Sequence, residues 1–173
     1  MNLVLAPNAL LETPVQHYPD QLHPAPIALD MIDVMNKHGG IGISANQVAF
    51  DGRIFVMKTT HNKKYGDYTV VINPVIRGLS DEKEYQEEAC LSHPGLVLKV
   101  KRPISCMVDF QTLTSDMKNV ITVSEKYEGI DARVFLHEYD HLFGIQYINR
   151  VSRLKYDMAE KKRIKRIKNG RTK

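Results

Sequence analysis

The first part of the chain contains one segment whose apolar residues follow a helical period. Ile27, Met31 and Met35 recur four positions apart, so a helix would place all three on one face. Pro26 stands near the start of this segment, where proline is well tolerated, and Gly39 follows its end, where glycine commonly stops a helix. The pattern therefore predicts an amphipathic helix that begins near Pro26 and ends before Gly39.

The middle of the chain has the character of strands. Turn signals such as Asp51-Gly52 separate five β-prone segments, at residues 53–58, 68–73, 96–101, 104–112 and 119–127. Since no helix is expected between them, neighbouring strands should pair mostly antiparallel. A second helix is expected to start near Gly129. We therefore expect an α+β single domain with largely antiparallel sheets packed around this central helix, followed by a basic C-terminal helix.

Composition favours a compact intracellular protein. The 173 residues are 43% hydrophobic, enough for one domain with a core, and contain no internal repeat or low-complexity block. No apolar stretch reaches the length of a membrane span, and the N-terminus lacks a basic leader before a long apolar segment. Two cysteines give no disulfide framework, which fits a reducing compartment. We expect a cytoplasmic monomer that does not bind membranes, with an organellar location left open.

The second helix carries the most informative motif of the chain. His137-Glu138-Tyr139-Asp140-His141 places two imidazoles four residues apart, on one face of a helix, where both can bind the same divalent metal. Glu138 lies between them, close enough to take a proton from a metal-bound water. Apolar residues precede and follow the motif, so the helix is expected to be buried, and buried histidines need partners or a metal. This pattern predicts a metal-dependent hydrolase.

The identity of the third metal ligand is open from the motif alone. Tyr147 stands where a metzincin would have its third histidine, which removes that possibility. Glu160 lies at about the distance of the gluzincin glutamate, although it belongs to a strongly charged segment. Cys106 lies in a strand-like run and is expected to be a small buried apolar residue. Cys90 lies between an acidic cluster and a turn-rich segment, where a thiolate could meet a cation.

Three motifs together resemble the peptide deformylases, metal hydrolases that remove the N-formyl group from new polypeptides. That family carries G-x-G-x-A-A-x-Q, then E-G-C-L-S, then Q-H-E-x-D-H. This chain reads GIGISANQ at residues 40–47, EACLS at 88–92 and LHEYDH at 136–141, in the same order and with similar spacing. The resemblance covers most of the chain. It implies a catalytic deformylase-like body at residues 1–149 and a basic C-terminal helix or tail of the same domain at 150–173.

The resemblance assigns chemical roles to the motif residues. It implies that Cys90, His137 and His141 bind the metal and that Glu138 acts first as general base and then as general acid. It assigns the Gln47 side-chain amide and the Leu91 backbone N–H to stabilising the oxyanion, each such donor lowering the barrier by about 3 kcal/mol. Glutamine suits position 47 because a donor without negative charge is needed there.

The resemblance also implies the substrate, the pocket and the metal. The substrate would be an N-formylmethionyl peptide, whose first side chain would enter a pocket lined by Ile41, Ile130 and Val134. Little side-chain bulk around Gly42 would let the peptide add as an extra strand. One thiolate and two imidazoles suit Fe²⁺, Zn²⁺, Ni²⁺ or Co²⁺, and the family resemblance makes Fe²⁺ the expected ion.

Three residues depart from the family pattern. Ala89 replaces the usual glycine and would be strained if its backbone needed a positive φ. Ser44 replaces the first alanine of the glycine-rich motif, and is expected to add a hydroxyl beside the substrate groove. Leu136 replaces the glutamine before His137 and removes a polar neighbour. None of these changes deletes a chemical role, so they bear on rate and substrate preference.

The C-terminal segment carries most of the positive charge. Residues 150–173 have a net charge of +9, which leaves −5 for the first 149 residues and gives the total of +4. A solvated helix end and an RNA-binding helix both explain this composition. The family resemblance favours a ribosome contact, made by the following basic residues: Lys161, Lys162, Arg163, Lys165, Arg166 and Lys168.

Two functions of other classes stay open at this point. The chain could be a zinc endopeptidase of the gluzincin type that uses Glu160 as a metal ligand. It could also be a non-catalytic RNA-binding or ribosome-binding protein that keeps a structural metal.

Overall fold

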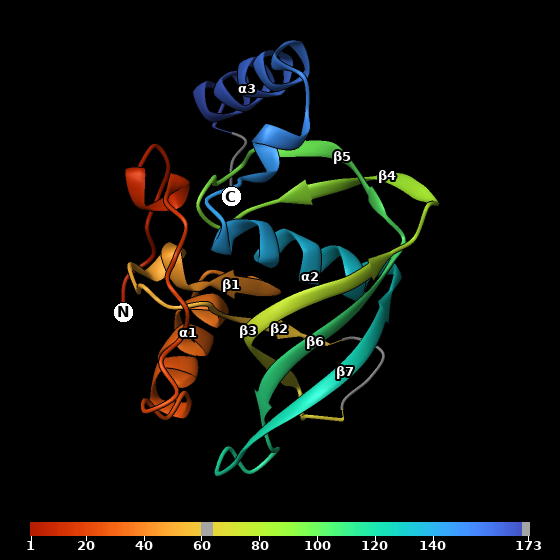
Figure 1. Cartoon of the computed structure of the whole chain (residues 1–173). Helices are drawn as coiled ribbons and strands as arrows, with labels where there is room; N and C mark the ends of the chain where they lie inside the picture. Colours follow the sequence, from red (N-terminus) through yellow and green to blue (C-terminus); the bar gives the residue numbers. More distant parts are fainter. Residues whose placement is uncertain (60–63, 171–173) are drawn as a thin grey trace.

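The computed structural model describes residues 1–59 and 64–170 and has the expected α+β architecture (Figure 1). One sheet has five strands in the order β1-β2-β3-β6-β7, and a second sheet consists of β4 and β5 alone. All strand pairs are antiparallel. The strands are β1 (Gly42–Ser44), β2 (Ile54–Lys58), β3 (Tyr68–Leu79), β4 (Lys83–Ala89), β5 (Val97–Pro103), β6 (Ser105–Leu113) and β7 (Val120–Glu128).

In the described part of the chain, three α-helices and three short 3₁₀ helices complete the fold. The α-helices are α1 (Ala25–Lys37), α2 (Gly129–Leu142) and α3 (Arg153–Lys168). The 3₁₀ helices are η1 (Ala9–Glu12), η2 (Ala45–Val48) and η3 (Tyr147–Arg150). Pro26 lies in the first turn of α1 and Gly39 follows its end at φ +69°, as the sequence predicted. Within the described residues, no helix is long and apolar enough to cross a membrane.

Helix α2 lies between the two sheets and packs against both (Figure 1). On the side of the five-stranded sheet it contributes Phe135, which is fully buried and packs edge-on against Phe55 of β2 with ring centroids 5.1 Å apart. Helix α1 packs against β1 and β2 and closes a second apolar cluster around Met31 and Met35. These contacts fix α2 in the middle of the molecule, as the sequence predicted.

Helix α3 lies outside the β4–β5 hairpin (Figure 1). A third apolar cluster lies beneath it, formed by Cys90, Leu96, Leu98, Val100 and Tyr147. Tyr156 and Ala159 of α3 pack against this cluster, although no residue of α3 is itself fully buried. The basic helix is therefore attached by one narrow face, and most of its surface is exposed.

Strand β4 is the main element that the sequence analysis did not predict. Its sequence is acidic and poor in strand-forming residues, so the sequence predicts only an acidic cluster before Cys90. In the structure Glu84, Gln86 and Glu88 alternate with the exposed Lys83, Tyr85 and Glu87. The inward residues are polar: Glu88 accepts from the buried Arg102 and Arg133, and the Gln86 amide donates to the Glu84 carboxylate. The usual apolar alternation of a strand is therefore missing.

Strand β3 extends beyond its predicted end at residue 73. The pairing with β6 shifts register between Ile72 and Val75, on either side of Pro74, and then continues to Leu79. Asn73 takes the left-handed conformation at φ +48°, and its Oδ1 accepts a hydrogen bond from the Tyr18 N–H at 2.8 Å. This bulge removes the need for a ladder hydrogen bond at the proline.

Candidate metal centre and active site

Helix α2 supplies two of the candidate metal ligands and is held at both ends. It starts at Gly129, which has φ +56°, and Gly144 follows it at φ +70°. A Cβ at Gly144 would lie 2.5 Å from the Glu12 carbonyl oxygen, so only glycine fits where the chain leaves the helix. His137 and His141 lie one turn apart, and their ring centroids are 5.1 Å from each other. Their shared face points toward Cys90.

Cys90 lies directly after β4 and faces both histidines. The ligand atoms of Cys90, His137 and His141 all lie within 4.8 Å of one another, and the three residues are buried. The Cys90 Sγ is 3.2 Å from His141 Nε2. One thiolate and two imidazoles converging on a point form a donor set that suits a transition-metal ion. These residues therefore fit the metal that the sequence analysis predicted.

Glu88 orients His137 from behind. His137 Nδ1 donates to Glu88 Oε2 at 3.0 Å, which leaves Nε2 as the nitrogen available to a metal. The same carboxylate accepts hydrogen bonds from Arg102 Nε at 2.6 Å and from Arg133 Nη1 at 2.7 Å. Burial by itself would raise the pKa of Glu88, but the hydrogen bonds from His137 and Arg102 outweigh it and bring this pKa to about 2. Glu88 is therefore an anion at neutral pH.

The two histidines have opposite electrostatic environments. Burial disfavours the charged form of His137, yet its interactions with Cys90 and Glu88 raise its pKa to about 10. Burial lowers the pKa of His141 well below its usual value, and the positive charge of His137 lowers it further. The surroundings of His137 thus favour positive charge, and a cation bound there would balance the charge of Glu88.

Glu138 is the candidate proton carrier. Its side chain is buried against Gly42 of β1, and its Oε2 has no hydrogen-bond partner among the described residues. Burial raises the pKa of Glu138 to about 7, against the lowering effect of the charges on His137 and Arg102. A carboxylate with a pKa near neutrality is suited to accept and return a proton under physiological conditions.

The amide of Gln47 is fixed in one orientation. Gln47 Oε1 accepts hydrogen bonds from the Ser44 N–H at 2.9 Å and from the Ser44 hydroxyl at 3.3 Å. Its Nε2 therefore faces the opposite way and donates toward Cys90 Sγ at 3.3 Å and Ser92 Oγ at 3.1 Å. The structure thus places an N–H donor beside the Cys90 sulfur.

The loop that carries Cys90 is held by three neighbouring segments. The His93 N–H donates to the Cys90 carbonyl at 2.9 Å, and the Ala6 N–H of the N-terminal segment donates to the Ser92 carbonyl at 2.9 Å. The His93 ring contacts Gln146 Oε1 at 2.6 Å, just before η3. Arg163 of α3 donates to the Pro94 carbonyl at 3.4 Å. These contacts fix the thiolate relative to the helix that carries both histidines.

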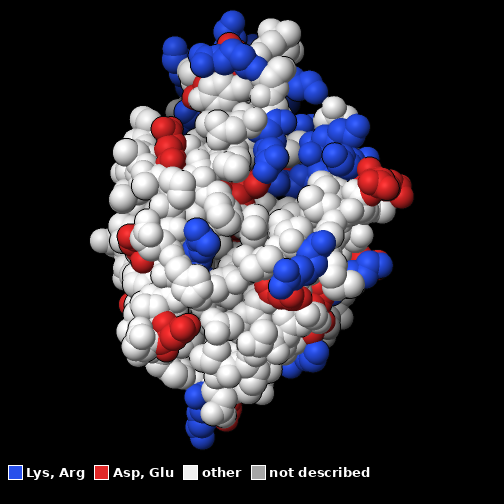
Figure 2. Space-filling view, in the orientation of Figure 1, with Lys and Arg blue, Asp and Glu red and all other residues white. Residues whose placement is uncertain are grey.

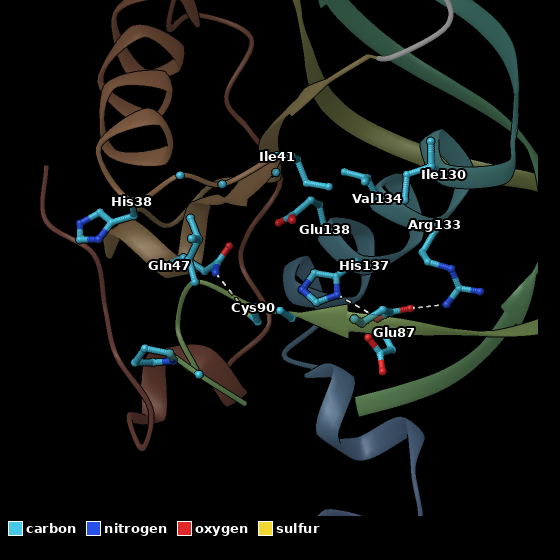
Figure 3. A pocket seen from close by; sticks show the side chains of 18 residues that line it. His38, Ile41, Gln47, Glu87, Cys90, Ile130, Arg133, Val134, His137 and Glu138 are labelled. Carbon is cyan, nitrogen blue, oxygen red and sulfur yellow. Dashed lines mark hydrogen bonds and ion pairs between the residues drawn. The ribbon is translucent and has the colours of Figure 1, made fainter. Parts of the chain in front are cut away.

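The centre opens into a cavity of about 540 Å³, which is large enough for part of a peptide (Figure 3). Ile41 and Ile130 lie at the mouth, with Ile41 51% exposed, whereas Val134 is buried further in. In Figure 3, Ile41, Ile130 and Val134 lie together beside Glu138, and Gln47 and Cys90 lie on the other side. Most of the site residues named from the sequence line this cavity: Ile41, Gly42, Gln47, Cys90, Leu91, Ile130, Val134, His137 and Glu138.

The remaining residues named from the sequence lie elsewhere. His141 is fully buried behind the cavity wall. The basic residues of the C-terminal segment lie on α3, outside the hairpin, and do not line the cavity. Glu160 is paired with Arg163 and is not part of the ligand cluster, and the Tyr147 hydroxyl donates to the Leu96 carbonyl at 3.0 Å. The structure therefore gives no support to Glu160 as a metal ligand.

Three charged residues of the site were missed from the sequence: Arg102, Arg133 and Asp140. Arg102 bridges Glu88 and Asp140, with its Nη1 2.7 Å from Asp140 Oδ2, and Arg150 closes on the same carboxylate. The available signal was the presence of Arg133 and Asp140 on a helix that is expected to be buried, together with Arg102 in a strand. Sequence alone gives no way to pair such residues, because the bonds from Arg102 and Arg133 to Glu88 and Asp140 span 14 to 45 positions.

The three departures from the family pattern have clear structural settings. Ala89 is not among the described residues with a positive φ, so the strain considered for it does not arise. The expectation that the Ser44 hydroxyl lies beside the substrate groove is wrong. This hydroxyl is buried and donates to Asn46 Oδ1 at 2.9 Å. Leu136 is buried in the apolar cluster on the far side of α2, where no polar neighbour is needed.

Comparisons with known proteins point to one family. A family model described as polypeptide deformylase matches residues 1–157. The peptide deformylase of Wolbachia pipientis wMel is 40% identical over 141 residues, which is 77% of this chain and 76% of that protein. The chloroplastic peptide deformylase 1B of Oryza sativa subsp. japonica is 39% identical over 123 residues, and the match covers 71% of this chain but 44% of that longer protein.

Solved structures agree with the sequence comparisons. The crystal structure of peptide deformylase from Thermotoga maritima matches with a TM-score of 0.75 and 30% identity, covering 87% of this chain and 96% of that one. The enzyme from Plasmodium falciparum matches with a TM-score of 0.80 and 27% identity, covering 96% of this chain and 95% of that one. The similarity therefore extends over nearly the whole fold.

Replacing Glu88 should weaken metal binding without removing a ligand. In Glu88→Gln the anion behind His137 is lost, and we expect the affinity for Zn²⁺ to fall by about 10- to 100-fold. Competition with a chromogenic chelator measures this affinity. Glu87→Gln is the matched control, because it removes the same charge from the adjacent, exposed residue of β4 and should bind Zn²⁺ like wild type. Equal affinities of the two folded variants would contradict the role given to Glu88.

Proposed function

The chain belongs to the peptide deformylase family, and we propose that its cavity removes the formyl group from the N-terminal methionine of newly made polypeptides. The observation that carries this proposal is the convergence of Cys90, His137 and His141 at one end of a cavity that also holds Glu138 and Gln47. A purely structural metal site is closed by its ligands and needs no free carboxylate. The unpartnered Oε2 of Glu138 is therefore better explained by catalysis.

Cys90, His137 and His141 would hold the metal. A divalent ion bound there would supply Lewis acidity, which activates a water molecule as nucleophile near neutral pH and polarises the formyl oxygen. Glu88 holds the ring of His137 in place through its Nδ1. The donor set suits Fe²⁺, Zn²⁺, Ni²⁺ and Co²⁺, and we propose Fe²⁺ as the working ion because of the family resemblance.

Glu138 and Gln47 would divide the remaining chemistry between them. Glu138 accepts a proton as water attacks the formyl carbon, and then delivers that proton to the nitrogen of the departing amine. Formate and a peptide with a free N-terminus are the products. Gln47 Nε2 and the Leu91 N–H donate to the oxygen on which negative charge develops. The Ser44 contacts that fix the Gln47 amide reduce the reorganisation needed for this step.

The peptide would bind along β1. This strand is the edge of the five-stranded sheet, since among the described residues it pairs only with β2. Gly42 keeps this edge open, and a formylmethionyl peptide would add to it through main-chain hydrogen bonds. The methionine side chain would then lie among Ile41, Ile130 and Val134, which form the apolar part of the cavity.

The proposal is tested by formate release from formyl-Met-Ala-Ser under anaerobic conditions. Wild-type protein loaded with Fe²⁺, Ni²⁺ or Co²⁺ should release formate, whereas Glu138→Gln should lose at least about 100-fold in kcat because the proton carrier is gone. Metal content of both proteins, measured by mass spectrometry, should be equal. The absence of formate from the metal-loaded wild type would refute the proposed activity.

Alanine at position 42 should impair Glu138 directly. A Cβ there would overlap with Glu138 Oε1 and lie 2.9 Å from its Cδ, so the carboxylate must move. We expect Gly42→Ala to reduce kcat about tenfold or more, since small displacements of a catalytic group are costly. In the control Gly78→Ala on β3, the new Cβ meets only the Met107 Cβ at 4.0 Å, and kcat should stay within about threefold of wild type. Similar losses in both variants would argue against a specific effect on Glu138.

We further propose that α3 contacts ribosomal RNA. The proposed contact is made by Lys161, Lys162, Lys165, Arg166 and Lys168, whereas Arg163 is engaged with Glu160 and the Pro94 carbonyl. Figure 2 shows Lys and Arg side chains gathered over α3. Deleting the helix would expose the apolar cluster under Tyr156 and Ala159, so point changes are the better test.

Neutralising three lysines of α3 should weaken ribosome binding and leave peptide turnover unchanged. We expect the triple Gln variant of Lys161, Lys162 and Lys165 to bind ribosomes at least about tenfold more weakly at physiological salt, because each lost phosphate contact weakens binding. Cosedimentation measures the binding, and formyl-Met-Ala-Ser turnover should be unchanged. The control is the triple Gln variant of Lys37, Lys118 and Lys126, which removes the same number of positive charges outside α3. If both triple variants bind equally, α3 is not the contact.

A further inference from the structure

A second cavity lies on the outer side of the β4–β5 hairpin, away from the metal centre. It has a volume of about 590 Å³ and lies between the hairpin and the first half of α3. Its apolar walls are contributed by Val97, Leu98, Val151, Met158 and Ala159, and its polar rim by Lys99 and Lys155. None of these residues takes part in the proposed deformylation. The cavity therefore needs an explanation of its own.

Tyr85 is the distinctive residue of this groove. It points outward from β4, and 57% of its surface is exposed, although an exposed aromatic ring gains little from the fold. Two ammonium groups lie over its ring, Lys155 Nζ at 5.0 Å and Lys101 Nζ at 5.7 Å from the centroid. Each such contact is weak at an exposed site, so a better partner for the ring could displace either lysine.

The charges around the groove favour an anionic partner. Lys99 and Lys101 follow each other on the outward face of β5, and Lys155 faces them from α3. Figure 2 shows Lys and Arg side chains gathered over α3 and the adjoining part of the hairpin. Glu87 is the acidic residue opposite Lys99 in the strand register, which leaves a positive balance along the groove. An aromatic ring flanked by lysines is how proteins commonly hold single-stranded nucleic acid.

We propose that this groove binds single-stranded RNA, with one base stacked on Tyr85 and the adjoining phosphates paired with Lys99, Lys101 and Lys155. Stacking of a base on an aromatic ring contributes more than the exposed lysine contact that it replaces, and the displaced lysine becomes free to bind phosphate. An acidic peptide would use the lysines but has no need of the ring. A base within a duplex has no free face for it. The proposal rests on the ribosome contact proposed for α3 in one respect: that contact would bring RNA close to the groove.

Binding of a fluorescein-labelled ten-residue oligouridine to the full chain, followed by fluorescence anisotropy, tests this proposal. Tyr85→Ala should weaken binding at least about fivefold, the lower end of the cost of losing one stacked base. Tyr85→Phe keeps the ring and should bind within about twofold of wild type. The slope of log affinity against log salt should stay the same in Tyr85→Ala but fall by about 0.7 in Lys99→Gln, which loses one phosphate contact.

Three results would overturn the proposal. One is an affinity of Tyr85→Ala for oligouridine equal to that of the wild type. Another is binding of a ten-base-pair RNA duplex as tightly as oligouridine, with no dependence on Tyr85. The third is displacement of the oligouridine by polyglutamate as effectively as by unlabelled oligouridine, which would indicate a site for acidic peptides. Formyl-Met-Ala-Ser turnover by Tyr85→Ala should equal wild type, which shows that the variant is folded. Ribosome binding of the α3 triple variant is measured separately, so failure of that contact is distinguishable from failure of this site.

Discussion

The structure depends on one buried carboxylate, that of Glu88. It joins the β4–β5 hairpin to the central helix through Arg102 and Arg133, and it holds the ring of His137. Burying so many charges carries a large desolvation cost, which is recovered only when every partner is present. Loss of one partner from such a cluster typically costs about 3–5 kcal/mol. The same interaction therefore determines both the position of the hairpin and the geometry of the metal centre.

This constraint explains which parts of the structure could be predicted from the sequence. Helices α1 and α2 were predicted because their apolar residues and glycines follow simple rules. The convergence of Cys90 with His137 and His141 followed from motifs, and the fold class followed from strands without intervening helices. Strand β4 and the pairing of Arg102 could not be predicted, because their partners are distant in sequence and an inward-facing glutamate looks the same as a solvated one. The far half of β3 was missed because a bulge at Asn73 accommodates Pro74.

Strand β4 serves two separate surfaces because its side chains alternate. Glu88 faces the central helix and the metal centre, whereas Tyr85 faces outward toward the groove beside α3. The loop after Cys90 lies between these regions, with Arg163 of α3 bound to the Pro94 carbonyl. The proposed deformylation and the proposed nucleic-acid contacts thus both depend on β4 but use different residues of it. A substitution on the outer face of β4, such as one at Tyr85, should therefore leave the metal centre on the inner face unchanged.

The free edge of β1 also bears on the solution behaviour of the protein. An unpaired sheet edge is a general hazard, because it can pair with the edge of another copy and begin aggregation. Here the free edge is limited to the three residues Gly42–Ser44, all of which are buried, and the exposed Ile41 borders the cavity beside them. An edge that is so short and so deeply placed is a poor template for the sheet of a second copy. The recess proposed for the peptide therefore also shields this edge from pairing between molecules.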